Sequence, residues 1–231
     1  MDEFDIKPVN TLKRVLKENT LGIVSDISEI GLDTLINGEI LKEFPIIGSV
    51  FRAGNTALAI KDVIDAKRVL VFVQRVQGND VEHDELNRHI EYLNANPQKA
   101  SAELETVLDY LSKQTGYKKA KILANFYYAF LEKRLKWEDF VLLADVTEDV
   151  SVSDLPMLQE LYAKRIYTDN DRYDRNCAKR LDRCNLIDYY NGMVVSSQND
   201  PNTRMTAAIN NVGRVFVEIG LSNLSNDLYS V

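Results

Sequence analysis

The chain contains few residues that could bind a metal or act as a nucleophile. Its two cysteines, Cys177 and Cys184, are seven residues apart, which places both thiols on one side of a helix, two turns apart. They form no CxxC pair and have no accompanying histidines, so we interpret them as small buried thiols rather than zinc ligands. The two histidines, His83 and His89, are six residues apart, whereas metal-binding pairs on helices are three or four apart. We expect them to be surface or capping residues.

The other short motifs also fail to indicate a catalytic or cofactor site. Residues 169–174 begin like a calcium-binding loop, but Asp174 occupies the position of the required glycine and Arg180 that of the bidentate glutamate. Residues 48–54 contain neither a GK[ST] ending nor a GxGxxG spacing. With no GxSxG or HExxH motif either, an enzyme would need a site assembled from scattered residues. We therefore predict no catalytic residues, no metal and no cofactor, and favour a protein that is not an enzyme.

Residues 171–186 predict a helix that is rich in positive charge, although Asp174 and Asp182 lie on the same helix. This helix is locally basic within an acidic chain, and it is our first candidate interaction face. Its candidate residues are Arg172, Arg175, Lys179, Arg180 and Arg183.

A hairpin follows this basic helix. Residues 187–190 favour a strand, Asn191 and Gly192 suit a two-residue type I′ turn, and residues 193–195 provide a returning strand. A helix, then a hairpin, then a further helix is the order in which the recognition helix and wing of a winged-helix module would appear. The recognition helix of such a module enters the major groove of DNA. The alternative is a solvated helix face that carries mixed charges.

The second candidate face lies in an apolar segment, residues 32–76, that we expect to form a helical hairpin. Small residues at four-residue steps, with a glycine beside them, allow two helices to approach closely, and in a membrane they would form an association face. Charged and polar residues interrupt this run before it reaches the length needed to span a bilayer. We therefore predict a tightly packed hairpin without stable membrane insertion in the resting state; insertion after a conformational change is the alternative. The residues of this candidate close-packing or membrane-active face are Gly48, Ser49, Ala53 and Ala57.

Apolar residues recur at helical spacing along most of the chain. The apolar run Val69 to Val73 fits a buried helix or a strand by periodicity, and its flanks favour a helix. Pro97 begins another predicted helix, because proline is tolerated in the first turn, and Ser153 is a candidate N-cap. The predicted helices are short segments within 11–36, one up to about residue 76, one up to about 93, one from Pro97 to just before Gly116, 117–134, 137–146, Ser153 through Tyr167, 171–186, and 205–221.

These elements predict a mainly α fold, a multi-helix bundle with a small C-terminal β-hairpin that is winged-helix-like. We expect an N-terminal apolar helical hairpin region in residues 1–78, a central helical bundle in 79–167 and a winged-helix-like unit in 168–231. The alternative is that all three form one compact body.

Composition bounds the class of the protein. A chain of 231 residues with 45% hydrophobic and 27% charged content is expected to be globular. A net charge of -7 and a pI of about 5.0 argue against a surface that tracks phosphates along the whole chain. Two cysteines are too few for a disulfide framework, and the acidic N-terminus has no apolar segment typical of a secretory signal. We therefore expect the protein to be cytoplasmic.

Two parts of the sequence resemble a known group of proteins. Residues 35–48 with 62–72, and residues 180–187 with 209–216, resemble a family of uncharacterised helical proteins from bacteria. Members of this family have an apolar N-terminal hairpin and a winged-helix-like C-terminal end, and they are often encoded near mobile or phage-defence genes. The resemblance implies a bacterial protein with an intracellular role in defence or regulation, and it brings no catalytic residues with it.

The leading hypothesis from the sequence is a non-enzymatic helical interaction protein of the bacterial cytoplasm that binds a protein partner or itself. The first alternative is a DNA-binding winged-helix regulator that uses Arg175, Lys179, Arg180 and Arg183, although nucleic acid is the less favoured partner because the chain is acidic. The second alternative is a membrane-active effector that uses residues 40–76.

Overall fold

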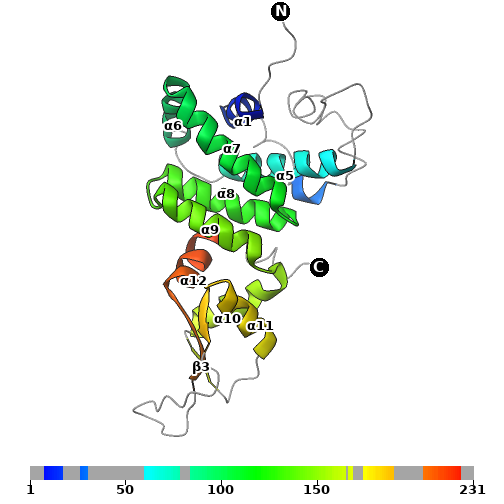
Figure 1. Cartoon of the computed structure of the whole chain (residues 1–231), viewed down its shortest axis with the longest axis vertical. Helices are drawn as coiled ribbons and strands as arrows, with labels where there is room; N and C mark the ends of the chain where they lie inside the picture. Colours follow the sequence, from blue (N-terminus) through cyan, green and yellow to red (C-terminus); the bar gives the residue numbers. More distant parts are fainter. Residues whose placement is uncertain are drawn as a thin grey trace, which may run out of the picture. The chain divides into compact units, whose positions relative to one another are not determined.

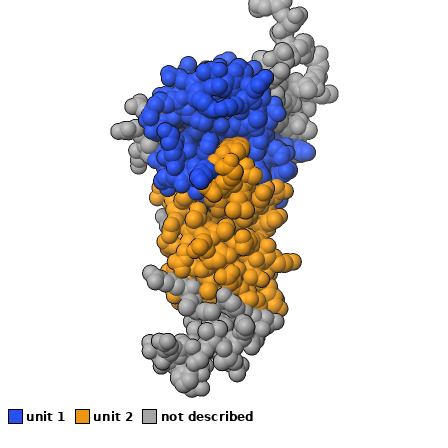
Figure 2. All heavy atoms as spheres, turned by 60° about the vertical axis from the view of Figure 1, so that its left-hand side comes forward, with its two compact units in different colours: residues 1–136 blue, residues 137–231 orange. Residues whose placement is uncertain are grey.

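The computed structural model describes residues 8–17, 27–30, 60–78, 84–164, 166–168, 174–189 and 205–224. This part of the chain is mainly helical, with a small antiparallel sheet in its C-terminal part, as predicted (Figure 1). The chain divides into two compact units, Met1–Lys136 and Trp137–Val231, which Figure 2 colours blue and orange. The segments expected from the sequence were 1–78, 79–167 and 168–231; α5 (Ile60–Gln77), which lies in the first of these, packs on α7 (Pro97–Lys113) and α8 (Tyr117–Leu131) of the second.

Unit 1 is helical in its described residues. Its elements are α1 (Pro8–Lys17), the short 3-10 helix η2 (Ile27–Glu29), α5 (Ile60–Gln77), α6 (Asp84–Ala95), α7 (Pro97–Lys113) and α8 (Tyr117–Leu131). Helix α5 contacts α8, α7, α1 and η2 (Figure 1). The apolar run from Val69 to Val73 is buried in α5 and is helical, as its flanks predicted. Pro97 is the first residue of α7, also as predicted.

Polar side chains of α5 bind the backbone of its neighbours. Gln77 Nε2 donates to the carbonyl oxygens of Val15 at 2.8 Å and Leu16 at 3.2 Å, so two carbonyls at the end of α1 gain a partner. Gln74 Oε1 accepts from the backbone N–H of Ile27 at 2.9 Å. The ammonium group of the buried Lys67 donates to two carbonyls of the η2 segment and lies 4.1 Å from the centre of the Tyr117 ring. Side chains of α5 therefore anchor the end of α1 and the η2 segment.

Unit 2 combines helices with a three-stranded antiparallel sheet of order β1-β3-β2. The central strand pairs Ala208 with Ile166 on one side and Ile209 with Ile187 on the other. Helix α10 contacts β1 and β3, whereas α11 contacts β2. The elements are α9 (Trp137–Asp149), the 3-10 helix η3 (Val152–Asp154), α10 (Leu155–Lys164), β1 (Ile166–Thr168), α11 (Arg175–Arg183), β2 (Ile187–Tyr189), β3 (Met205–Ile209), α12 (Asn211–Val215) and the π-helical turn η4 (Phe216–Gly220).

Two helix predictions in unit 2 were wrong at their ends. The helix expected through Tyr167 ends at Lys164, and Tyr167 lies in β1. The helix expected from Met205 begins only at Asn211, because the first five residues of that segment form β3. Strand β3 is hydrogen-bonded on both sides, so pairing within the sheet overrides the weak strand preference of its alanines.

The predicted hairpin is described only in part. Strand β2 forms where the sequence indicates, and its partner in the described structure is β3. The predicted turn at Asn191 and Gly192 and the returning strand at 193–195 lie outside the described residues.

Candidate interaction surface

Helix α11 is bounded at its N-terminus by a side-chain cap and at its C-terminus by a backbone motif. The carboxylate of Asp174 accepts from the backbone N–H of Asn176 at 2.8 Å and so acts as the N-cap. At the other end, Asn185 has a φ of 57°, Leu186 N–H donates to Leu181 O at 3.0 Å, and Asn185 N–H donates to Asp182 O at 2.9 Å. This is a Schellman motif, in which the buried Leu181 and Leu186 form the usual apolar pair. Hydrogen bonds therefore fix both ends of this nine-residue helix.

The start of α12 packs closely on this C-terminal turn of α11. Asn210 caps α12 by accepting from Gly213 N–H at 2.9 Å, and its amide donates to Asn185 O at 3.0 Å. A Cβ at position 213 would lie 2.0 Å from Leu186 O, so only glycine fits there without a shift of the backbone. The sheet, α12 and α11 are thus held together at one place.

Arg180, although its side chain is partly exposed, is engaged with a buried carboxylate. Its guanidinium group donates two hydrogen bonds to Asp154, from Nε at 2.7 Å and from Nη2 at 2.6 Å. Asp154 is only 2% exposed, whereas the Arg180 side chain is 41% exposed. This bidentate geometry is the strongest form of an arginine–carboxylate pair. It joins α11 to η3, which precedes α10.

The electrostatics around Asp154 follow from this pair. Burial, the largest single influence, would raise the pKa of Asp154, but the hydrogen bonds from Arg180, Cys177 and Ser153 together with the charge of Arg180 outweigh it and hold the pKa below its ordinary value. Cys177, also buried, lies 4.0 Å from the Asp154 carbonyl oxygen. Burial, and then the nearby Asp154, raise the pKa of the Cys177 thiol to about 12. Cys177 is therefore a neutral thiol at physiological pH, which does not suit a nucleophile.

Three of the predicted cations form an exposed row, which we call the basic stripe: Arg175, Lys179 and Arg183. They stand four residues apart and so lie on one side of α11. The described residues provide no ion-pair partner for any of the three. Asp182, on the same side, accepts from the Tyr189 N–H at 3.1 Å. Arg172, the fifth predicted residue, lies outside the described residues.

Unit 1 contains a polar cluster that sequence reasoning missed. Glu103 Oε1 lies 2.7 Å from His89 Nε2 and accepts the hydroxyl of Tyr127 at 2.7 Å. The His89 ring meets Phe130 and Tyr127 edge to face. Burial, and then Glu103, raise the pKa of Tyr127 well above its ordinary value. The three polar residues come from α6, α7 and α8, so helical spacing within any one segment gave no signal for them.

This cluster has the geometry of a structural contact between three helices. A histidine–carboxylate pair is also found in catalytic sites, where the histidine moves a proton for a nearby nucleophile. Aromatic rings surround His89 here, including Tyr92 at 5.9 Å between ring centres. We assign the cluster to the packing of α6 on α7 and α8. His89 is therefore neither a capping residue nor freely exposed, as its contact with Glu103 shows.

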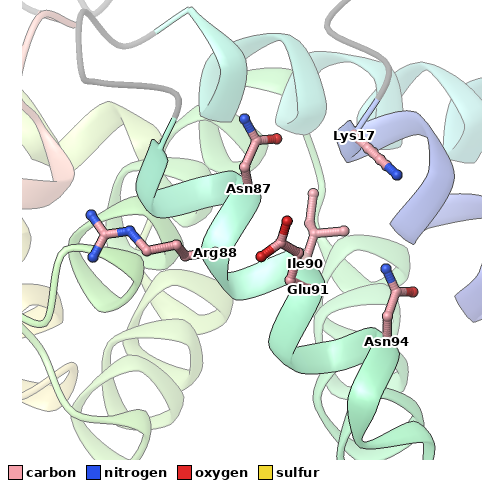
Figure 3. A pocket seen from close by; sticks show the side chains of 6 residues that line it. All are labelled: Lys17, Asn87, Arg88, Ile90, Glu91 and Asn94. Atoms are coloured by element: carbon pink, nitrogen blue, oxygen red, sulfur yellow. The ribbon is translucent and has the colours of Figure 1, made fainter.

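A hollow of about 480 Å³ lies between the end of α1 and α6. Figure 3 shows Lys17 across from a row of α6 residues, while Arg88 points to the other side of α6. Ile90 is the one buried residue of the lining, and Arg88 already pairs with Glu85. The polar lining is exposed and mixed in charge, so it does not indicate one class of ligand. The lining residues are Lys17, Asn87, Arg88, Ile90, Glu91 and Asn94.

The second predicted face, which comprises Gly48, Ser49, Ala53 and Ala57, lies outside the described residues. Within the part of the chain that is described, no helix has both the length and the apolar character needed to cross a bilayer. Nor do the described residues bring together three or more His, Cys, Asp or Glu side chains in a way that could hold a metal ion. Comparison with protein-family models, with curated proteins and with solved structures gives no match.

Proposed function

We propose that the chain is a non-enzymatic interaction protein, which uses the basic stripe of α11 to bind an acidic surface on a protein partner. The observation that carries this proposal is the exposed row of three cations on α11, the basic stripe. Asp174 and Asp182 each bind a backbone N–H, and Arg180 binds Asp154. Arg175, Lys179 and Arg183 are exposed on this helix and engage in none of these contacts, although the exposed carboxylate of Asp182 lies beside them.

The charge of unit 2 favours protein over nucleic acid as the partner. Residues 137–231 contain nine Lys and Arg against fifteen Asp and Glu, so the stripe lies on a strongly acidic unit. A duplex with its dense phosphates would be repelled by the rest of such a unit. An acidic patch of limited size on a protein would contact the basic stripe without approaching the acidic remainder of unit 2. Regulation or phage defence, which the family resemblance implies, would be served by either kind of partner.

The test is a charge reversal of the stripe with a matched control. The variant Arg175→Glu, Lys179→Glu, Arg183→Glu changes the net charge by six, as does the control Lys61→Glu, Lys99→Glu, Lys133→Glu, in which three exposed cations of unit 1 are reversed. Proteins cross-linked to the tagged chain in the cells that produce it are identified, purified and titrated by calorimetry. We expect binding to be lost in the stripe variant and retained in the control. Equal binding by both variants would contradict the proposal.

DNA binding is the second candidate, because α11 exposes its basic face and is followed by the antiparallel strands β2 and β3. Fluorescence anisotropy with duplex DNA distinguishes the two readings. We expect no affinity tighter than the roughly micromolar, non-specific range at physiological salt. A nanomolar, sequence-dependent affinity that falls steeply with salt and is lost in the stripe variant would favour the DNA-binding regulator instead.

A further inference from the structure

We infer that the acidic partner of the basic stripe is a second copy of this chain, which presents the exposed face of α9. This inference rests on the proposed function, since it names the occupant of the same surface. It is carried by the complementary charge of two helices in unit 2.

Helix α9 has one buried and one exposed side. Its buried side holds Phe140, Leu143, Ala144 and Thr147. The exposed residues Glu138, Leu142, Asp145 and Asp149 follow one another at three- or four-residue steps, so they share the outward side; we call them the acidic stripe.

An exposed leucine lies within this acidic stripe. Leu142 is 46% exposed, and in the described part of the chain only Tyr92 is another large apolar residue with comparable exposure. An apolar side chain surrounded by charges is the arrangement expected of a small docking surface, in which the charges select the partner and the apolar group is buried on contact.

The two stripes match in length as well as in charge. The basic stripe covers about 12 Å of helix from Arg175 to Arg183, and the acidic stripe about 16 Å from Glu138 to Asp149. Two helices that lie side by side can place two of the cations, about 6 Å apart, opposite Asp145 and Asp149, while the third lies about one turn from Glu138, beside Leu142.

A second copy is a suitable occupant because it carries the complementary stripe on the same unit. Each copy of unit 2 carries one basic stripe and one acidic stripe. In a two-fold pair, the basic stripe of each copy meets the acidic stripe of the other, so both contacts form together and both Leu142 side chains are buried.

The expected association is weak and depends on salt. Two helix contacts bury less surface than a standard stable interface, and exposed ion pairs contribute little each. We expect a dissociation constant on the order of 10 to 100 µM at low salt. It should weaken about tenfold or more in 500 mM NaCl, since the Debye length falls to a few ångströms at such salt.

The experiment is sedimentation equilibrium of the full chain at 50 and 500 mM NaCl. One variant reverses the basic stripe (Arg175→Glu, Lys179→Glu, Arg183→Glu). A second variant reverses the acidic stripe (Glu138→Lys, Asp145→Lys, Asp149→Lys). We expect each to be monomeric alone and an equimolar mixture of the two to associate again, because the reversed stripes then complement one another. The unit 1 control, Lys61→Glu, Lys99→Glu, Lys133→Glu, should associate like the wild type.

Two further measurements do not depend on the folding of these multiple variants. Leu142→Ala should weaken self-association of the chain several-fold, and the salt dependence is measured on the wild type itself. Association that is equal at both salt concentrations, or unaffected by Leu142→Ala, would overturn the inference. A wild type that stays monomeric at 300 µM would also overturn it. In that case, stripe-dependent binding of another acidic protein would leave the proposed function standing, and the absence of such binding would remove both.

Discussion

The pair between Asp154 and Arg180 allows a sharp test of how unit 2 is held together. The substitution Arg180→Met keeps much of the apolar stem of the side chain but removes both hydrogen bonds to Asp154. The carboxylate of Asp154 is 2% exposed, and a buried carboxylate without a partner costs about 3 kcal/mol of unfolding free energy. The double variant Asp154→Asn, Arg180→Met has no such charge. We therefore expect the double variant to be more stable than Arg180→Met alone.

The assay is urea unfolding followed by tryptophan fluorescence, because Trp137 is the single tryptophan of the chain and belongs to unit 2, where it stacks on Phe140. The control is Lys179→Met, which removes an exposed cation from the same helix and should change the free energy by less than about 0.5 kcal/mol. Equal effects of Lys179→Met and Arg180→Met, or a double variant less stable than Arg180→Met, would refute the reasoning.

The same pair predicts a pH dependence. The pKa of Asp154 is lowered in the folded state, so its contribution to stability is present above the pKa of the unfolded chain, about 4. That contribution is lost as pH falls through the lower, folded pKa. Without Arg180, burial disfavours the charged carboxylate, which then takes up a proton more readily. The stability difference between the wild type and Arg180→Met should therefore shrink as the pH is lowered, first above about 4 as Asp154 of the variant takes up its proton, and further below about 4 as the wild type loses its own contribution. A difference that stays constant from pH 7 to pH 3 would contradict this account.

Three more predictions concern packing and reactivity. Gly213→Ala should destabilise unit 2 by about 3 kcal/mol in the tryptophan assay, because its Cβ would lie 2.0 Å from Leu186 O. Gly116→Ala, whose Cβ meets nothing within 4 Å, should cost much less by circular dichroism, about 0.5 kcal/mol for the loss of glycine at the N-cap of α8. Tyr127→Phe should lower the unfolding free energy by about 1.5 kcal/mol in urea unfolding followed by circular dichroism, since it removes a buried hydrogen bond to Glu103. The effect should be larger than that of Tyr128→Phe, because the Tyr128 hydroxyl binds Glu132 within one helical turn. At pH 8, Ellman's reagent should label Cys184 before Cys177, because Cys177 is buried and its pKa is about 12; labelling in the reverse order would contradict the described burial.

Local signals predicted those parts of the fold that local interactions determine. Pro97 marked the start of α7 because its ring suits the first turn of a helix. The run from Val69 to Val73 is helical within flanks that favour a helix. The strands were harder to predict, since Tyr167 and the residues of β3 acquire their extended conformation by pairing across the sheet. When the pairing partner of a strand is distant in the sequence, the residue pattern of the strand alone does not reveal the pairing.

Sequence-based prediction has the same limit for the charged residues of α11. The sequence shows four cations and two carboxylates in residues 174–183 but not which of them are available. Arg180 looks equivalent to Lys179 until α11 is placed against Asp154, 26 residues earlier in the chain. The sequence also does not show that Asp174 and Asp182 each accept a hydrogen bond from a backbone N–H, which fixes the direction of both carboxylates.

This distinction decides how the surface has to be tested. Reversing Arg180 would leave the buried carboxylate of Asp154 opposite a second negative charge, so loss of binding in such a variant would report damage to unit 2 rather than a missing contact. Arg175, Lys179 and Arg183 are exposed, and the described structure gives them no ion pair to break. Their reversal changes the surface while it leaves the pair between Asp154 and Arg180 in place. A binding defect confined to these three positions, with the tryptophan unfolding curve unchanged, is therefore the result that assigns the interaction to the basic stripe.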